Sequence, residues 1–171
     1  MMRLLFTIDL ANYDSDDQVT IRNSARSIII KDNRLAMVYS QRYDYYKFPG
    51  GGIEKGEDPL WAMVRETKEE AGLLVDISSI KPYGYVHRIE KSRFGGIFIQ
   101  DNFYYLCQVQ PKRVLQALDA YEQEEGFTLV YVDGKKVIDI NRHHDHQDVD
   151  QTMLERECKV IEILYQEGYI R

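Results

Sequence analysis

Short apolar stretches along the chain predict most of its strands. Alternating or continuous apolar residues predict strands at residues 3–10, 27–30, 35–39, 81–89, 97–110 and 127–132. The second and third of these flank a turn centred on Asp32 and Asn33, residue types that tolerate left-handed backbone, so the pattern predicts a hairpin. Residues 11–18 are polar and acidic, which is typical of a loop, and Asp133-Gly134 predicts a further turn.

Apolar residues at helical spacing predict helices in three places. Residues 148–165 carry an apolar residue every three or four positions, which predicts a terminal helix, and residues 114–121 give a shorter, less regular pattern. Asp58, Pro59 and Gly72 suit an N-cap, a first helical position and the left-handed residue after a helix, so they predict a helix between them. Strands mixed with helices, without a repeat or a linker, indicate one domain over residues 1–171 of the α+β or mixed α/β class.

Three glutamates share one side of the helix that follows Pro59. At about 100° per residue, Glu66, Glu69 and Glu70 fall within an arc of roughly 100°. The apolar stripe of the same helix lies beside that arc, so the carboxylates are expected at the rim of a cleft and not on the far solvent side. This stripe contains Leu60, Met63, Val64, Thr67 and Ala71.

Composition limits the functions that are available. The chain of 171 residues, 44% apolar and 29% charged, is large enough for one domain with its own core. The net charge of −6 argues against a general binder of polymeric nucleic acid, because phosphates would repel it. No apolar run approaches the ~20 residues of a membrane span, and the first ten residues lack a signal-peptide cleavage site. Cys107 and Cys158 are far apart and indicate reduced thiols, so we expect a cytoplasmic protein.

The glutamates together with the preceding glycines favour a metal site. Glu66 and Glu70 form a like-charged i,i+4 pair, which costs a few tenths of a kcal/mol unless a cation neutralises it. The glycines at 50–52 let the backbone approach a ligand closely, with carbonyls free to bind it. Hard oxygen donors suit Mg²⁺ or Mn²⁺. A solvated acidic helix face is the alternative.

The spacing of these residues resembles the Nudix box. The pattern is Gly51, five residues, Glu57, seven residues, and then Arg-Glu-Thr-Lys-Glu-Glu-Ala-Gly-Leu at residues 65–73. Each fixed position of the box is present, and the departure is Thr67, where the family usually has an aliphatic residue. The resemblance implies a Nudix-type α/β/α sandwich with a mixed central β-sheet.

The resemblance also implies an activity and roles for the box residues. Nudix proteins typically hydrolyse a nucleoside diphosphate linked to another moiety, by water attack at phosphorus. Glu66, Glu69 and Glu70, with the carbonyl of Gly50, are then the expected metal ligands. Arg65, paired with Glu57, is expected to hold these carboxylates in place. The general base is a box glutamate or one on a later loop, where Glu122, Glu124 and Glu125 lie; a solvated acidic turn is the alternative for these three, and we take Glu125 as the candidate.

Candidate substrate residues come from the strands after the box. Arg88 and Arg93 could contact substrate phosphates, against the alternative of a solvated hairpin tip. Tyr83 and Tyr85 could stack a base, against the alternative of strand packing. The markers of the ADP-ribose, dinucleoside polyphosphate and coenzyme A subfamilies are absent. The sequence therefore does not identify the moiety, X, that is linked to the nucleoside diphosphate of the substrate. Among small relatives, a MutT-like nucleoside triphosphate pyrophosphatase is preferred on size alone.

Other functions remain open at this point. A non-catalytic nucleotide sensor with the same fold usually lacks box carboxylates, and none is missing here. An isoprenyl diphosphate isomerase would need Cys107 to face the metal site, although a core position is the simpler expectation. The histidines at positions 143, 144 and 146 could suggest zinc but lack ligand spacing, so we expect an exposed connection there. The expected partner is a small nucleotide, with no membrane, and the family resemblance allows a homodimer.

Overall fold

The computed structural model describes residues 1–171 and contains four α-helices and twelve short or long strands. The helices are α1 (Pro59–Ala71), α2 (Ala120–Glu125), α3 (Gly134–His143) and α4 (Gln151–Gln166). The strands are β1 (Leu4–Asp9), β2 (Val19–Ile21), β3 (Ser24–Ile28), β4 (Ile30–Lys31), β5 (Arg34–Ser40), β6 (Tyr45–Lys47), β7 (Gly50–Gly52), β8 (Leu73–Val75), β9 (Lys81–Lys91), β10 (Ile97–Leu106), β11 (Val109–Arg113) and β12 (Phe127–Val132).

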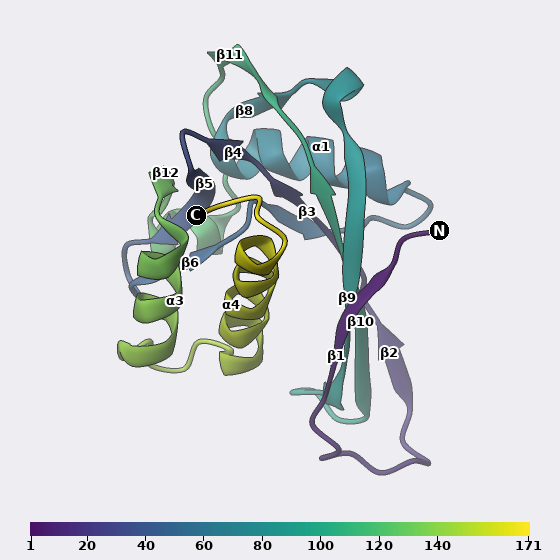
Figure 1. Ribbon diagram of the computed structural model, residues 1–171. Coiled ribbons are helices and arrows are strands. Elements are labelled where there is room, and N and C mark those ends of the chain that lie inside the picture. Colours follow the sequence, from purple (N-terminus) through teal and green to yellow (C-terminus); the bar gives the residue numbers. More distant parts are fainter.

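The strands form a larger sheet with mixed pairing, a smaller antiparallel sheet and a two-stranded sheet of β8 and β11. The larger sheet has the order β1-β9-β10-β3-β7, with β2 also paired to β10; β1 lies parallel to β9, and β3 parallel to β10. The smaller sheet has the order β12-β5-β4, with β6 paired to β5. In Figure 1 the β9–β10 hairpin, flanked by β1 and β2, extends below the rest of the molecule.

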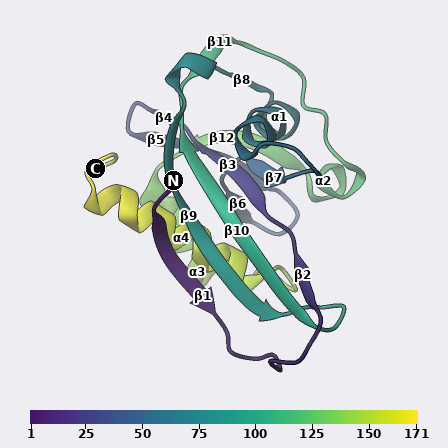
Figure 2. The ribbon, with the colours of Figure 1, turned by 90° about the vertical axis from the view of Figure 1, so that its right-hand side faces the viewer.

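Helices cover both faces of the sheets. Along β5, Leu35 and Met37 point into one apolar cluster while Ala36 and Val38 point into another, because successive side chains of a strand alternate. The first cluster contains residues of α3 and α4, and the second contains residues of α1. Figures 1 and 2 show α1 on one side of the strands and the α3–α4 pair on the other. This confirms the expected α/β/α sandwich with a mixed sheet.

Helix α1 and the first hairpin follow the sequence prediction. Asp58 accepts a hydrogen bond from the Leu60 amide, Pro59 begins the helix, and Gly72 ends it with a left-handed φ of 67°. Asp32 and Asn33 have φ values of 50° and 61° and turn the chain between β4 and β5, as a tight two-residue hairpin requires. The strand predicted at residues 127–132 is confirmed as β12, and the terminal helix as α4.

The helix predicted at residues 114–121 is wrong. The chain is irregular from Val114 to Asp119, and α2 begins only at Ala120. The Val114 amide donates to the Gly72 carbonyl at 3.0 Å, and the Ala117 amide donates to the Glu69 carbonyl at 2.7 Å. These backbone groups satisfy the free carbonyls at the end of α1, and that contact outweighs a weak local preference for helix.

The turn predicted at Asp133-Gly134 is also wrong, since it begins α3. Asp133 is the N-cap and accepts from the Lys135 amide at 2.8 Å. A side chain at Gly134 would lie 2.9 Å from the Ile161 side chain of α4, so glycine permits the close approach of the two helices. Asp-Gly suits a turn and a helix start equally well, and packing on α4 favours the helix.

Side chains of α3 and α4 form hydrogen bonds to the backbone of β6 and of Phe48, just before the glycine strand β7. Asn141 of α3 accepts from the Tyr46 amide and donates to the Tyr46 carbonyl, both at 2.9 Å. Glu157 of α4 accepts from the Phe48 amide at 2.8 Å. These buried contacts fix the path of residues 45–49, which leads directly into Gly50. None of the helices is both long and apolar enough to cross a membrane.

Candidate active site

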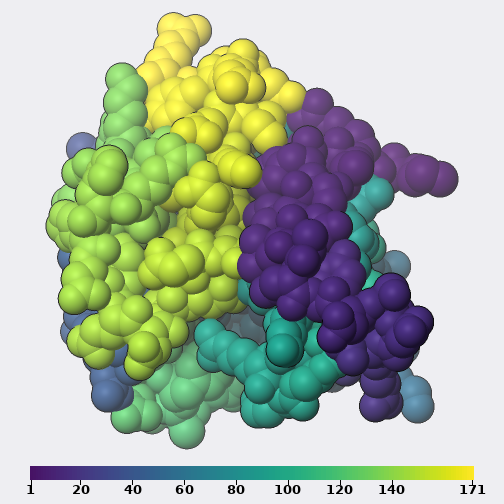
Figure 3. Space-filling view, turned by 90° about the horizontal axis from the view of Figure 1, so that it is seen from below, coloured from purple at the N-terminus to yellow at the C-terminus, as the bar shows by residue number.

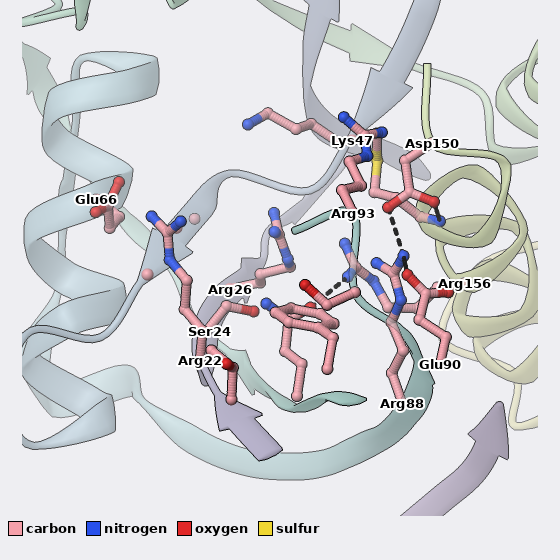
Figure 4. A pocket seen from close by; sticks show the side chains of 18 of the residues that line it. Arg22, Ser24, Arg26, Lys47, Glu66, Arg88, Glu90, Arg93, Asp150 and Arg156 are labelled. Carbon is pink, nitrogen blue, oxygen red and sulfur yellow. Dashed lines mark hydrogen bonds and ion pairs between the residues drawn. The ribbon is translucent and has the colours of Figure 1, made fainter. Parts of the chain in front are cut away.

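A polar cavity of about 470 Å³ lies at the junction of β3, β7, the β9–β10 hairpin, α2 and the start of α4. Viewed from below in Figure 3, the surface is hollowed between α4 and the hairpin. Figure 4 shows Glu66 on one side of the cavity and Arg88 with Asp150 on the other, with Arg22 and Arg26 between them. The charged residues that line it are Arg22, Arg26, Lys47, Glu66, Arg88, Glu90, Arg93, Asp119, Glu122, Asp150 and Arg156.

Gly51 allows Glu66 of α1 to lie directly against the backbone of β7. A Cβ atom at Gly51 would lie 2.5 Å from the Glu66 carboxylate, so any other residue would displace that side chain. β7 is held in place by antiparallel pairing with β3, which aligns Ala25 with Gly51 and Arg26 with Gly50. The carboxylate and the glycine backbone together form one edge of the cavity.

Arg65 ties three glutamates together. Its Nε and Nη2 atoms each donate to Glu57 at 2.9 Å, and its Nη1 atom donates to Glu66 at 2.7 Å and to Glu69 at 3.3 Å. Nη2 also donates to the Gly52 carbonyl at 3.1 Å. The Arg65 hydrogen bond holds the pKa of Glu57 below its usual value, while burial raises the pKa of Glu66 against the pull of Arg65. The contact expected between Arg65 and Glu57 is therefore present.

Glu70 is the most deeply buried of the three box glutamates. Its side chain is 1% exposed, and it accepts from Lys47 Nζ at 2.6 Å and from the Gly50 amide at 3.3 Å. Burial raises the pKa of Glu70 to about 7, although the charge of Lys47 opposes that rise. Glu70 thus shares a buried ion pair with a residue next to the glycine strand.

The donor atoms fit a hard divalent cation, although they are paired with cations of the protein itself. Glu66 and Glu69 contact Arg65, and Glu70 contacts Lys47. No three histidine, cysteine or carboxylate side chains converge around one point. The oxygen-only donor set and the space that Gly51 leaves for Glu66 match the preference of Mg²⁺ and Mn²⁺. Arg65 contacts one oxygen of Glu66 and one of Glu69, so the second oxygen of each carboxylate is free of that contact.

The structure separates the three glutamates near α2. Glu122 is 6% exposed and lines the cavity with Glu66. Glu125 lies outside it, in a neighbouring groove, where it accepts from Ser40 Oγ at 3.0 Å and Tyr45 Oη at 2.8 Å. Glu124 is a surface residue paired with Arg42. The candidate base Glu125 thus lies in the neighbouring groove, and of the three glutamates it is Glu122 that the turn of α2 directs to the cavity.

Arg88 and Arg93 both line the cavity, in different environments. Arg88 is only 5% exposed, and its Nη2 atom donates to Glu90 and to Asp150, the latter at 2.6 Å. Arg93 lies in the exposed turn of the hairpin and also borders the Glu125 groove. Arg93 is therefore a solvated residue at the tip of the hairpin, as the alternative expected, whereas Arg88 is buried.

Tyr83 and Tyr85 do not line the cavity. Tyr83 is 6% exposed and donates to Glu167 at 2.7 Å, near the chain's C-terminal end. Tyr85 packs against Phe103 with ring centroids 5.9 Å apart. Neither ring is placed to stack a base in the cavity, and the alternative of strand packing describes both, because strand alternation directs Arg88 and Glu90 of β9 to the cavity instead.

The cysteine and the histidines stay apart from the site. Cys107 lies in the core cluster under α1 and does not line the cavity, and burial raises its pKa to about 12. His143 and His144 are on the surface, whereas His146 is buried at 2% exposure between the carbonyls of Tyr43 and Ile140. The exposed connection expected here is thus wrong for His146, which joins the turn at Tyr43 to helix α3.

Sequence reasoning missed several cavity residues. Arg26 and Lys47 belong to strands whose other residues are buried. A charged residue among buried strand residues was the feature that could have marked them as site residues. Arg156 is 1% exposed and belongs to the inward face of α4, between apolar positions. Asp150 is the N-cap of α4, a role that its residue type before a helix indicates. Nothing in the neighbouring sequence indicates that it also pairs with Arg88.

Comparisons with known proteins identify the family of the chain. The family model for the NUDIX domain matches residues 21–149, a range that leaves out β1 and α4. An RNA pyrophosphohydrolase of a Nitratiruptor species is 33% identical over 88 residues, covering 47% of this chain and 54% of that protein. Nucleoside diphosphate-linked moiety X motif 6 of Mus musculus is 30% identical over 89 residues, covering 52% of this chain and 25% of that protein. The chain therefore spans about half or less of the length of these relatives.

Solved structures show the same fold. A NUDIX hydrolase from Nitrosomonas europaea superimposes with a TM-score of 0.58 at 17% identity, covering 87% of this chain and 90% of that one. An ADP compounds hydrolase superimposes with a TM-score of 0.57 at 20% identity, covering 90% and 78%. At these identities the likeness concerns the fold alone. Because the family match spans residues 21–149 and the box at residues 51–73 is complete, the chain belongs to the Nudix family.

Proposed function

We propose that this chain is a metal-dependent hydrolase that cleaves the diphosphate linkage of a nucleoside diphosphate derivative or a nucleoside triphosphate. The observation that carries the proposal is the arrangement around Gly51, where Glu66 lies against the glycine backbone and is held by Arg65. This arrangement borders a cavity whose other sides carry several arginines, which suit an anionic substrate.

The residues that would hold the metal are Glu66, Glu69 and Glu70, with the carbonyl of Gly50. When bound, divalent cations neutralise the diphosphate and lower the pKa of a water molecule. These oxygen donors lie on one face of α1 and on the neighbouring strand β7, which hold them at fixed positions. Phosphoryl transfer depends mainly on such positioning.

The chain's own residues divide the remaining tasks. Arg65 orients Glu66 and Glu69 through hydrogen bonds at 2.7 Å and 3.3 Å, and Glu57 in turn fixes Arg65. Arg26 lies beside Gly50, where its charge stabilises a phosphoryl group at the glutamates. Glu122 replaces Glu125 as the candidate base outside the box, because it lines the same cavity as Glu66.

The relatives' names bring a second substrate into consideration. Several related proteins are named RNA pyrophosphohydrolase, so the 5′ end of an RNA is the alternative to a free nucleotide. The net charge of −6 favours the free nucleotide, since a polymer brings many further phosphates close to an acidic surface.

The test is a panel of nucleoside diphosphate derivatives and triphosphates, and a 5′-triphosphorylated RNA, each with Mg²⁺ and with Mn²⁺. We expect metal-dependent hydrolysis that Glu69→Gln reduces by about a hundred-fold or more in kcat, with an unchanged fold. Glu155→Gln is the matched control: Glu155 also pairs with an arginine and is similarly exposed, at 40% against 42% for Glu69. Full turnover in Glu69→Gln, or no hydrolysis of any compound, would contradict the proposal.

A further inference from the structure

An ion pair in α4 is completely removed from solvent. The Nε and Nη2 atoms of Arg156 donate to Glu157 Oε1 at 3.0 Å and 2.6 Å, and the two side chains are 1% and 0% exposed. Replacing a buried ion pair by apolar residues of similar size is often neutral or stabilising, because both charges lose their hydration on burial. What distinguishes this pair is therefore the set of groups that it connects.

Glu157 holds the backbone that leads into the glycine strand. Its second oxygen, Oε2, accepts from the Phe48 amide at 2.8 Å. The Phe48 carbonyl accepts from Arg26 Nη1 at 3.1 Å, and the Phe48 ring packs edge-on against Tyr104 with ring centroids 5.7 Å apart. Side chains thus hold both backbone polar groups of the residue that lies two positions before Gly50.

Arg156 reaches the other end of the glycine strand. Its Nη1 atom donates to Asn102 Oδ1 at 2.7 Å, and Ser24 Oγ donates to the same oxygen at 2.6 Å. Ser24 lies opposite Gly52 in the pairing of β3 with β7. One ion pair therefore connects the backbone before Gly50 with the residue that pairs with Gly52.

The orientation of the Asn102 amide shows that this network is constrained. Because its oxygen accepts from both Ser24 and Arg156, the Nδ2 atom of a side chain that is 0% exposed has no partner. Turning the amide over would place Nδ2 against the same two donors. Buried donors without partners are rare and costly. The network keeps this geometry at a cost in stability, which favours a positioning role over a stabilising one.

Strand β7 depends on contacts from other elements. It has no side chains, and it pairs with β3 at the end of the sheet, without a second neighbouring strand. On α1, Arg65 donates to the Gly52 carbonyl and Glu70 accepts from the Gly50 amide, but both residues belong to the box. Glycine also has the largest backbone freedom of any residue. The network of Arg156 and Glu157 fixes the two ends of β7 independently of the box.

We propose that Glu157 and Asn102, joined by Arg156, are positioning residues that fix the Gly50 carbonyl relative to the glutamates of α1. This inference rests on the proposed function. Neither Glu157 nor Asn102 lines the cavity, so their effect on the reaction passes through β7 and not through contact with the substrate. Glu157 also lies beyond residues 21–149, which the family model matches.

Nuclear magnetic resonance of the metal-free protein tests the positioning directly. Glu157→Gln leaves one oxygen for two sets of donors, and Asn102→Leu removes the other shared oxygen at similar volume. Each variant should shift the amide signals of residues 50–52. Glu155→Gln is the matched control, since Glu155 pairs with Arg142 at the surface of the same helix, and should leave these signals unchanged. Unchanged glycine signals in both network variants would overturn the inference.

Binding and kinetics then show whether the position of β7 matters for the reaction. Glu157→Gln and Asn102→Leu should each raise the dissociation constant for Mn²⁺ by about ten-fold or more, measured by calorimetry. At saturating Mn²⁺, kcat should fall by a similar factor while KM changes by less than about two-fold, because the substrate contacts in the cavity remain. A change in KM alone, with unaltered Mn²⁺ affinity, would contradict the positioning role.

A destabilised control separates positioning from a general loss of stability. Leu164→Ala deletes buried apolar contacts of α4, on the side that packs with α3, and lowers stability without touching the network. It should retain the Mn²⁺ affinity and the glycine signals of the wild type. If it weakens Mn²⁺ binding as much as Glu157→Gln, the effect is one of stability and the inference fails. Because Glu157→Gln and Asn102→Leu act on opposite ends of the network, either one alone allows the test if the other does not fold.

A double variant tests whether the two ends act as one network. In Glu157→Gln/Asn102→Leu, the rise in the Mn²⁺ dissociation constant should be smaller than the product of the two single effects, because residues that share a network are not additive. A rise equal to that product would mean two independent contacts and would contradict the role of Arg156 in joining them.

The outcomes distinguish this inference from the proposed function. If no compound is hydrolysed but Mn²⁺ affinity and the glycine signals still depend on Glu157 and Asn102, the hydrolase proposal fails and the positioning role stands. If metal-dependent hydrolysis is found and both variants match the wild type in kcat and in Mn²⁺ affinity, the hydrolase stands and the positioning role is overturned.

Discussion

Residues one position apart on α1 have very different environments. Glu69 is half-exposed and contacts Arg65, whereas Glu70 is fully buried against Lys47. Burial of a carboxylate is costly, and a nearby ammonium offsets part of that cost. The stability of the protein and the proposed metal chemistry therefore depend on the same Lys47–Glu70 pair.

Removing Lys47 should destabilise the protein at alkaline pH. Lys47→Met leaves an ionised Glu70 buried without its ion-pair partner, so we expect the free energy of unfolding at pH 8 to fall by about 3 kcal/mol. At pH 5 the loss should be smaller, because Glu70 is then protonated. Urea denaturation at both pH values measures this. Lys68→Met, at an exposed position of the same helix, should change stability by less than about 0.5 kcal/mol.

Glu70 should also make the metal-free protein less stable as the pH rises. Its pKa is raised from 4.5 to about 7 in the folded state, so the unfolded chain loses this proton first. The free energy of unfolding therefore falls between about pH 4.5 and about pH 7, by at most about 3 kcal/mol from this group. Glu70→Gln should lack this part of the pH dependence, and the difference between the two proteins' denaturation curves in EDTA isolates it. Parallel curves would contradict the raised pKa.

Among the elements, β6 shows how helices can substitute for a missing strand. β6 pairs with β5 on one side only, and its other edge is completed by side chains of α3 and α4. Asn141 provides both a donor and an acceptor to Tyr46, as a neighbouring strand would. The position of the following glycine strand, and with it of Gly50 and Gly51, depends on these helix contacts.

Replacing Asn141 should therefore cost more than an ordinary hydrogen bond. Asn141→Leu leaves the amide and the carbonyl of Tyr46 buried without partners, and we expect a loss of about 3 kcal/mol in unfolding free energy. Asn12→Leu removes an exposed asparagine that accepts from the Lys91 amide, and should cost well under 1 kcal/mol by urea denaturation. A cost for Asn141→Leu as small as that of the control would show that water replaces the asparagine.

Elements with strong local signals could be predicted, and those determined by packing could not. Asp58, Pro59 and Gly72 mark the ends of α1 in the sequence itself, because caps depend on neighbouring residues. Residues 114–119 have no such local determinant, since their backbone amides serve the carbonyls at the end of α1, which lies far away in the sequence. The start of α3 at Gly134 depends in the same way on a neighbour, α4.

At the scale of the whole molecule, the cavity brings together residues from almost the entire chain. The box contains Glu57, Arg65 and Glu66, and its resemblance to the family implied that Arg65 holds these carboxylates, as the structure shows. The rest of the lining includes Arg22, Arg88 and Asp150, which share no local pattern. The pairing of β2 and β9 with β10 and the packing of α4 bring these residues together, so the sequence could name Arg88 as a candidate for substrate phosphates but could not predict its neighbours Arg22 and Asp150.

Metal binding should stabilise the whole molecule, because the glutamates are held in place only when α1 and β7 are folded together. Saturating Mn²⁺, at about a hundred times its dissociation constant, adds about 2.7 kcal/mol, which corresponds to several degrees in Tm for a chain of this size. Glu69→Gln should lose much of this shift, while Glu155→Gln should retain it. Thermal unfolding at constant ionic strength measures the shift without reference to hydrolysis. An equal shift in both variants would mean that Mn²⁺ binds elsewhere, and Arg65 would then serve only to neutralise the carboxylates of α1.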